Sequence, residues 1–404
     1  MATTKYGPVR VWDQYRLLRI LNCPLALAII GGLYGMVLAG FLLWAFAGDA
    51  SKLVHAAQPH TDARLAPGSL SVGSVSEGYD GQFYYRMAVS PFSTAREVGG
   101  VRFDLGPHRQ QRIGYPLLVR LASGGDRDLV PWAMLGVNLL GLVVLGAISG
   151  ALAHDSGRHA LFGLLFVAYP GFVYTLGLDL AEILASTFML GGILCLRRRQ
   201  PLAAALLWSF AVLTRETTAV VPIAMALTWA WQALSRRPGR HAPVGDLLAA
   251  LIPLVVAAAW QVYLHLAWGH FGPESSSKDL LRFPFAGIIS QRNVFYPASG
   301  AGVFRLLSLG LIVLMITVGL LVIRRSSAPL HEKVALVLGA VILTVLSGAI
   351  WAGATGFMRA GTEAYLLASL VIMGAHRWRM VWLLCLPVVG VWALTAASVV
   401  AKAY

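Results

Sequence analysis

Charged residues are scarce in this chain: Asp, Glu, Lys and Arg make up 12% of its 404 residues, whereas hydrophobic residues make up 57%. So little polar surface cannot solvate a globule of this size in water, which excludes a soluble fold and makes the lipid bilayer the expected solvent. The sequence therefore predicts an all-α polytopic membrane protein, with residues 1–404 forming a single transmembrane domain.

Cysteines and common cofactor-binding motifs are also missing or uninformative. Cys23, Cys195 and Cys385 lie in or beside hydrophobic runs without metal-ligand spacing, which argues against a disulfide framework or a zinc site. The sequence contains no phosphate-binding P-loop, dinucleotide-binding glycine motif, zinc-protease helix motif or serine-hydrolase elbow. Nucleotide-driven chemistry is therefore not expected, and no cofactor is firmly implied.

The net charge of +14 does not indicate a nucleic-acid partner, because the basic residues are dispersed in short loops and form no basic face. Membrane topology explains them better. With the N-terminus inside, basic residues greatly outnumber acidic ones in the inner segments, whereas the two are nearly balanced in the outer segments. This segregation follows the positive-inside rule and predicts that the long first loop and the C-terminus lie outside.

About eleven apolar segments are candidates for transmembrane helices, given that a helix needs roughly 20 apolar residues to cross the hydrocarbon core. The first follows a basic stretch and is too long for a signal-peptide core, so we expect a retained anchor. Gly31 and Gly35 within it form a small-xxx-small pair typical of helix packing. The predicted spans are residues 24–46, 130–152, 160–176, 180–196, 202–213, 217–234, 247–268, 303–323, 334–351, 364–373 and 381–400.

Two polar segments interrupt this pattern on the predicted outer side. Residues 47–129 form an extracytoplasmic loop too long for a simple connection, and such loops are usually functional or disordered. We expect residues 68–74 to be a flexible connector, and residues 82–88 and 116–121 to form short helices at the membrane interface. The second extracytoplasmic loop, residues 269–300, is also polar and aromatic.

The first motif of the long loop, residues 79–86 (YDGQFYYR), places one carboxylate among aromatic and amide side chains. Asp80 is a candidate general base, because a carboxylate can take a proton from an acceptor hydroxyl. Asp80 would also be a suitable N-cap for a helix that begins at Gly81, and the two roles are compatible. The side chains expected to orient a substrate are Tyr79, Gln82, Tyr84 and Tyr85.

The second motif, residues 108–116 (HRQQRIGYP), supplies positive charge in the same loop. Arg109 and Arg112 would share a face on a helical turn. Two guanidinium groups on one face could bind a phosphate through paired hydrogen bonds. Contact of both arginines with lipid headgroups is an equal alternative. His108 is either a further donor to the anion or an ordinary loop histidine. Gln111 and Tyr115 complete the candidate substrate-binding residues of this motif.

Ionisable residues also lie at the predicted outer ends of later spans, where they are candidates for function. Asp179 and Glu182 are substrate-binding candidates, a second acid or ligands of a divalent cation, unless they only cap the fourth span. Arg215, in the segment LTRET at residues 213–217, either binds an anionic lipid or pairs with Glu216. Arg359 follows the ninth span on the same side.

The order of these motifs resembles that of the GT-C superfamily, integral membrane glycosyltransferases that use polyprenyl-phosphate sugars. The acidic motif in the first outer loop is followed by RQQRIGYP at residues 109–116 and by LTRET. The chain looks like a bacterial branch of this superfamily, distantly similar to the GPI mannosyltransferases. Their Trp-Asp-Gly motif corresponds to Tyr79-Asp80-Gly81 here, with Tyr in place of Trp.

The resemblance implies a GT-C-like fold in a bacterial cytoplasmic membrane, with the active site on the extracytoplasmic side. It implies inverting transfer from a polyprenyl-phosphate-linked sugar to a lipid, glycan or protein acceptor, with Asp80 as the base. The residues expected to hold the donor phosphate are Arg109, Arg112, Arg215, Arg359 and His108.

Two other classes stay open on the sequence. One is a polysaccharide polymerase or ligase that uses lipid-pyrophosphate substrates, and the other is a non-enzymatic transporter of lipids or solutes. A transporter should show inverted repeats and polar residues near the midplane, whereas the polar groups of this chain crowd the outer side.

Overall fold

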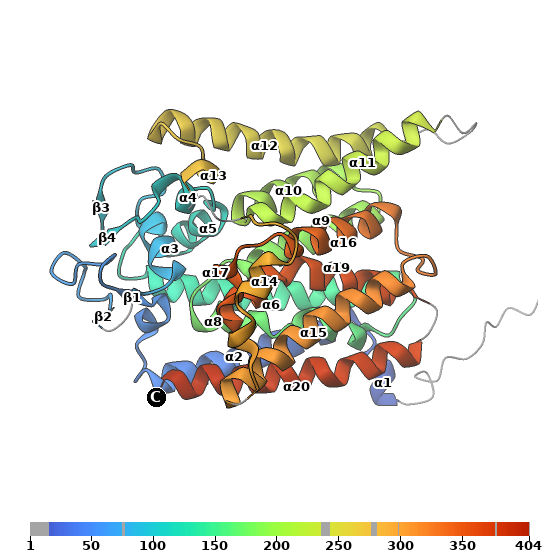
Figure 1. The fold of residues 1–404 in the computed structure, drawn as a ribbon, viewed down its shortest axis with the longest axis horizontal. Coiled ribbons are helices and arrows are strands. Elements are labelled where there is room, and N and C mark those ends of the chain that lie inside the picture. Colours follow the sequence, from blue (N-terminus) through green and yellow to red (C-terminus); the bar gives the residue numbers. More distant parts are fainter. Residues whose placement is uncertain are drawn as a thin grey trace, which may run out of the picture.

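The computed structural model describes residues 16–74, 77–235, 243–275, 281–297, 299–375 and 378–403. Helices dominate, and Figure 1 shows the long ones lying side by side with a region of short elements at one end. The bundle consists of α1 (Arg16–Leu21), α2 (Pro24–Ala45), α6 (Val130–Asp155), η3 (Ala160–Gly163), α7 (Leu164–Val167), α8 (Gly171–Gly177), α9 (Glu182–Arg197), α10 (Pro201–Thr214), η4 (Glu216–Ala219), α11 (Val220–Leu234), α12 (Val244–Trp268), α15 (Gly300–Val322), α16 (Leu330–Thr344), α19 (Thr362–Met373) and α20 (Trp378–Ala403).

Six helical segments are long and apolar enough to cross a membrane: α2, α6, residues 216–234 (η4 with α11), α12, α15 and α20. A seventh is formed if residues 160–177, which are bent by 60°, count as one span. The chain is therefore an all-α membrane protein. Each of the eleven predicted segments contains a helix, but several are short: α10 has 14 residues and α19 has 12, which is about 21 and 18 Å of helix.

The short elements belong mainly to the long first loop. They are η2 (Ala50–Val54), β1 (Ala56–Ala57), β2 (Val72–Gly73), α3 (Asp80–Val89), β3 (Glu97–Val98), β4 (Val101–Arg102), α4 (Gly106–Gln110) and α5 (Gly114–Ser123). Later segments add α13 (Gly272–Ser275), α14 (Ala286–Ser290), η5 (Arg292–Phe295), α17 (Gly348–Trp351) and α18 (Ala354–Ala360). β1 pairs with β2 in parallel, and β3 pairs with β4 in antiparallel orientation.

The two predicted short helices of this loop are present as α3 and α5, but α3 is not a surface helix. Eight of its ten residues are buried. They join α5 and the start of α6 in a second hydrophobic core, separate from that of the bundle. The position of Asp80 is therefore fixed by packing on nearly all sides of α3.

The connector at residues 68–74 was predicted to be flexible, and this prediction is wrong. Ser71 is held by two hydrogen bonds: its amide N–H donates to Ser51 Oγ at 2.9 Å, and its hydroxyl donates to Asp49. Ser69 donates to Asp128 at 2.5 Å, and Leu70 between them is buried. Small polar residues therefore tie this segment to its neighbours instead of leaving it solvated.

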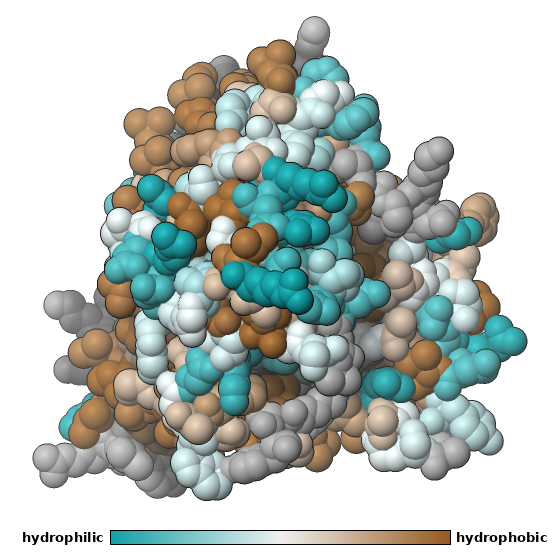
Figure 2. Space-filling view, turned by 90° about the vertical axis from the view of Figure 1, so that its left-hand side faces the viewer, coloured by the Kyte–Doolittle hydropathy of each residue, from teal (hydrophilic) through white to brown (hydrophobic). Residues whose placement is uncertain are grey.

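The two ends of the bundle differ in the elements and side chains that they carry. Figure 1 shows α1 at the end opposite to the short elements, whereas the C-terminus lies beside them. Figure 2 looks onto the end with the short elements and shows hydrophilic side chains across much of its centre. At the opposite end, the predicted inner residue Arg197 pairs with Glu332 at 2.6 Å, and Arg198 contacts Asp155 at 3.3 Å.

The predicted small-residue packing of the first span lies between α2 and α6. A Cβ atom on Gly31 would stand 2.9 Å from the carbonyl oxygen of Leu142, and one on Gly35 would stand 2.8 Å from the Leu142 side chain. From the other helix, a Cβ on Gly146 would overlap with the carbonyl oxygen of Leu27. Glycine is thus required for the close approach of the two backbones.

Gly146→Ala should destabilise the protein, because the added methyl group must push α2 and α6 apart. Gly136→Ala on the same helix is the matched control, since a Cβ there meets nothing within 4 Å. Alanine is intrinsically the better helix former by about 1 kcal/mol, so the control should be neutral or stabilising. Thermal unfolding of both variants in detergent checks this, and equal melting temperatures would contradict the packing.

Cysteine labelling tests the topology. In a background with the three native cysteines replaced by alanine, a membrane-impermeant thiol reagent added to intact cells should modify Ser74→Cys and leave Arg198→Cys unmodified. Both positions are exposed on their own ends of the molecule, and permeabilised cells should show labelling of both. The reverse pattern would overturn the orientation.

Candidate active site

Asp80 stands in the first turn of α3, and glycines on both sides let the chain reach this position. Gly78 has a φ of +74°, a conformation that L side chains rarely adopt. A Cβ on Gly81 would lie 2.6 Å from the carbonyl oxygen of Val54 and 2.7 Å from that of Leu178. Tyr79 is the N-cap residue of α3 and makes no side-chain capping bond, so Asp80 is not the cap and its carboxylate is directed elsewhere.

The Asp80 carboxylate contacts three guanidinium groups. Arg109 Nη1 donates to Oδ1 at 2.7 Å, and Arg359 Nη2 donates to Oδ2 at 2.9 Å. Arg112 Nη1 lies 3.8 Å from Oδ2. The predicted base and three of the four predicted phosphate-binding arginines are thus brought together from segments up to 279 residues apart.

The fourth arginine, Arg215, lies in a deeper layer of the same network. Glu182 Oε1 accepts from Arg359 Nε at 2.6 Å and from Arg215 Nη1 at 2.5 Å. Arg215 Nε is also 2.7 Å from Glu363, and its Nη2 donates to the carbonyl oxygen of Arg359 at 2.7 Å. These side chains are almost completely buried, with Glu182 only 2% exposed.

Two further carboxylates close the network towards the surface. Asp104 binds Arg109 through two hydrogen bonds of 2.8 and 2.6 Å, and Glu216 binds Arg112 through two of 2.9 and 2.6 Å. We call the nine side chains together the charge network: Asp80, Asp104, Arg109, Arg112, Glu182, Arg215, Glu216, Arg359 and Glu363. Its four guanidinium groups and five carboxylates alternate, so that each buried charge has at least one partner of opposite sign.

The electrostatic environment keeps Asp80 ionised. Burial alone would raise its pKa, but the guanidinium groups of Arg359, Arg109 and Arg112 outweigh burial and hold the pKa of this carboxyl well below its ordinary value. Burial lowers the pKa of His108, and the charge of Arg112 adds to this effect. The Nδ1 of His108 lies 3.2 Å from the Gln111 amide nitrogen.

Aromatic rings cover the guanidinium groups near Asp80. Arg109 lies over Phe83 at 4.4 Å, and Arg359 lies 5.2 Å from the ring centre of Tyr79. Tyr84 faces the same side of α3 and packs edge-on against Tyr115 at 5.4 Å. The predicted residues Tyr79 and Tyr84 therefore line the site directly.

Other predicted substrate-binding residues are engaged within the protein. The Gln82 side chain accepts from the amide of Ala57 at 3.2 Å and from Thr61 at 2.8 Å, and the Tyr85 hydroxyl donates to the carbonyl oxygen of Arg127 at 3.3 Å. Gln111 accepts from Gln261 on α12 at 3.3 Å. The structure thus uses these three side chains to hold the loop against its surroundings.

Asp179 lies outside the first turn of α9, in a left-handed conformation with a φ of +47°. It is fully buried, and neither carboxylate oxygen has a hydrogen-bond partner. The nearby Tyr115 donates to the carbonyl oxygen of Met134 at 3.1 Å and accepts from Asn138 at 3.0 Å. Asp179 therefore stands apart from the charge network, whereas Glu182, three residues later, is at its centre.

The residues present do not fit a divalent cation at Asp179 and Glu182. Glu182 Oε1 is shared by two guanidinium groups, and its Oε2 accepts from Thr175 at 3.4 Å. In the parts of the chain that the structure describes, no three His, Cys, Asp or Glu side chains gather to hold a metal ion.

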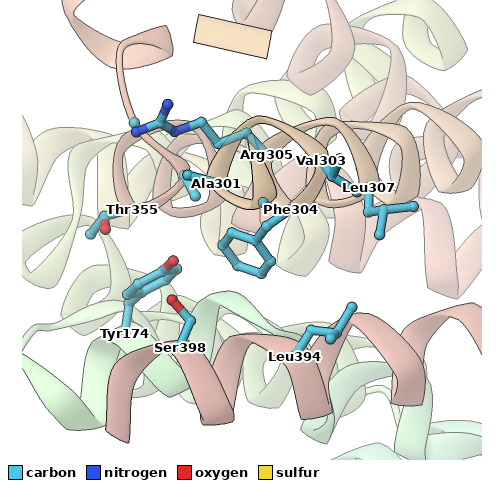
Figure 3. A pocket seen from close by; sticks show the side chains of 12 residues that line it. Tyr174, Ala301, Val303, Phe304, Arg305, Leu307, Thr355, Leu394 and Ser398 are labelled. Atoms are coloured by element: carbon cyan, nitrogen blue, oxygen red, sulfur yellow. The ribbon is translucent and has the colours of Figure 1, made fainter. Parts of the chain in front are cut away.

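The space around Asp80 is closed. It is bounded by Asp80, Phe83, Tyr84, Met87, Arg109 and Arg112 and has no room for a water molecule. A larger cavity of about 530 Å³ lies between α8, α15, α18 and α20. Figure 3 shows Phe304 pointing from α15 into this cavity, with Tyr174, Thr355 and Ser398 at one end and Leu307 and Leu394 at the other.

The cavity adjoins the charge network through α18. Thr355 lines the cavity, and Arg359 follows four residues later on the same helix, so the two side chains share a face. The outer surfaces of α15 and α20 beside the cavity are apolar, with Leu307 and Leu394 each 47% exposed. An amphiphile could therefore place its apolar part between α15 and α20 and its polar end towards Arg359.

Sequence reasoning missed two members of the charge network. Glu363 directly precedes the predicted tenth span, residues 364–373, and the criterion that singled out Glu182, an ionisable residue at the end of a span, would have found it. Asp104 carries no such signal, because its role depends on the fold of the loop. Glu216 was considered only as a partner of Arg215, whereas the structure pairs it with Arg112.

Neither a known protein-family model nor a curated protein matches this chain. The fold and the site define a polytopic α-helical membrane protein that carries a buried network of carboxylates and guanidinium groups at one end of its bundle.

Glu182→Gln should strongly destabilise the protein, because it leaves the buried guanidinium groups of Arg215 and Arg359 without their shared carboxylate. Removing one partner from a buried ion pair costs about 3–5 kcal/mol. Glu97→Gln is the matched control, since Glu97 pairs with the exposed Arg102 in the same loop region. Melting temperatures that fall equally in both variants would show that the buried network does not stabilise the fold.

Proposed function

We propose that this chain is an inverting glycosyltransferase of the GT-C type, which transfers a sugar from a polyprenyl-phosphate donor to an extracytoplasmic acceptor. The observation that carries the proposal is the contact of one carboxylate, Asp80, with three guanidinium groups at the polar end of a membrane bundle. Such a transfer needs a base for the acceptor hydroxyl and, close to it, several positive groups that bind the donor phosphate. About eleven spans in a bacterial cytoplasmic membrane, with the site on the outer side, belong to the same proposal.

In this proposal Asp80 takes the proton of the acceptor hydroxyl. The acceptor oxygen then forms a bond to the anomeric carbon while the bond from that carbon to the phosphate oxygen breaks. The electron pair stays on the departing polyprenyl phosphate, and the proton stays on Asp80. Arginine favours this step because negative charge develops on the leaving oxygen, where fixed donors stabilise the transition state most.

The pairing of Asp80 also links donor binding to base strength. A carboxylate held by Arg109, Arg112 and Arg359 is a weak base, because its pKa lies far below the range that suits proton abstraction. A donor phosphate that engages these guanidinium groups would withdraw them from Asp80 and raise its pKa. The base would then become effective only when the donor is present, which would protect the activated sugar from premature attack.

The cavity between α15 and α20 supports a lipid-linked donor over a water-soluble one. Its apolar end is lined by Leu307 and Leu394, and its polar end lies one helical turn from Arg359. A prenyl chain could occupy the apolar end while the phosphate reaches the arginines. A transporter is less consistent with the site, because the charge network gathers at one end of the bundle and not near its middle.

Asp80→Asn should reduce transfer by roughly 100-fold or more, because it removes the base at nearly constant shape. The measurement is sugar transfer by the purified protein in proteoliposomes with a panel of polyprenyl-phosphate sugars. Asp62→Asn, the same change at an exposed position of the same loop, is the control and should leave turnover unchanged. Near-normal turnover by Asp80→Asn would rule out the base. A product that grows by many sugars would instead indicate the polymerase.

A further inference from the structure

Glu216 differs from the other carboxylates of the charge network in its exposure. Its side chain is 39% exposed, against 2% for Glu182, 7% for Glu363, 17% for Asp80 and 25% for Asp104. It lies between α10 and α11, 104 residues from its partner Arg112. Glu216 is therefore the acidic member of the network that solvent or an incoming ligand reaches most easily.

The geometry of the Arg112–Glu216 pair is that of an arginine binding a planar or tetrahedral oxyanion. Nε and Nη2 of Arg112 donate in parallel to the two oxygens of Glu216, at 2.9 and 2.6 Å. This fork is the arrangement with which arginine binds phosphate. The remaining nitrogen, Nη1, points towards Asp80, at 3.8 Å from Oδ2. Arg112 thus presents its best anion-binding edge to Glu216 and only its third nitrogen to Asp80.

We infer that Glu216 is an internal substitute for the substrate phosphate, and that binding of a phosphate monoester or diester to Arg112 displaces its carboxylate. This inference rests on the proposed function, because it concerns the same arginines. It adds a residue that sets donor affinity without touching the reacting atoms. The carboxylate keeps Arg112 neutralised and oriented while the site is free of substrate, and it moves towards solvent when the phosphate arrives.

The other carboxylates are poorer candidates for this exchange. Glu182 and Glu363 are buried beneath the arginines that they hold, so their departure would leave charges without partners. Asp104 is fixed by its own loop, because its carboxylate also accepts from the amide of Leu105 at 2.7 Å. Glu216 lies nearer the surface than these side chains. Its exposed position lets water replace Arg112 as the partner of the carboxylate.

A binding experiment on the purified full-length chain in detergent tests the inference, with farnesyl phosphate as the probe and farnesol as the control ligand that lacks the phosphate. Glu216→Gln should bind farnesyl phosphate roughly tenfold tighter than the parent, because the phosphate no longer competes with a charged partner in a forked pair. Binding of farnesol should not change. Glu97→Gln makes the same change of charge in the outer region without touching the network, and should leave both affinities unchanged.

Two further variants test whether the gain in affinity depends on Arg112. Arg112→Gln should weaken binding of farnesyl phosphate, and adding Glu216→Gln to it should bring no gain, since coupled residues are not additive. Glu216→Asp keeps the charge but cannot reach both guanidinium nitrogens, so its affinity should lie between those of the parent and Glu216→Gln. Thermal unfolding of each variant identifies any loss of fold.

The failure of this inference can be told apart from the failure of the proposed function. If Arg112→Gln weakens binding of farnesyl phosphate but Glu216→Gln leaves it unchanged or weaker, Arg112 binds phosphate and Glu216 is only a structural partner. If none of the Arg112 and Glu216 variants alters the affinity, Arg112 does not hold a phosphate, and this part of the proposed function fails with the inference.

Discussion

The pairing of buried charges is the constraint on which the outer end of this protein depends. An unpaired ionised group away from water is so costly that carboxylates and guanidinium groups must find each other there. Asp80 on α3, Arg109 on α4 and Arg359 on α18 are held in contact by this requirement. Glu182 extends it to α9 and α10 through Arg215. The network therefore fixes the relative positions of helix ends that the apolar packing of the bundle alone would leave free to slide.

Much of the fold follows from the sequence because a single long apolar segment in a bilayer can satisfy its backbone within itself only as a helix. The same scarcity of charge made the site visible: in a chain this apolar, each ionisable residue outside the inner loops has a strong reason to be there. Asp80, Arg109, Arg112, Arg215 and Arg359 were found on this basis and lie in one network. The number of membrane-crossing helices could not be fixed in the same way, because α10 and α19 are too short to judge by hydropathy.

What the sequence could not predict is which charge pairs with which. Glu216 follows Arg215 directly in the chain, yet it binds Arg112. The backbone of Arg215 is extended and η4 begins at Glu216, so the two side chains point apart while the fold brings Arg112 close. Asp104 and Ser71 are inconspicuous for the same reason: their partners are set by the path of the loop. The fully buried Asp179 has no partner and a left-handed backbone.

A network that neutralises itself has a consequence for ligand recognition. Four guanidinium groups held close together without ligand would repel one another, so the five carboxylates make the folded protein possible before any substrate binds. The carboxylates also set a minimum strength for anion binding, because an incoming anion must interact more favourably with each arginine than the carboxylate that it replaces. In the proposed function, the donor phosphate would engage Arg109, Arg112 and Arg359, which the Asp80 carboxylate contacts here, and it would offer them more oxygens than a carboxylate does. Under that proposal, the alternating charges favour a phosphate over weaker anions, because any anion must replace carboxylates that the arginines already hold.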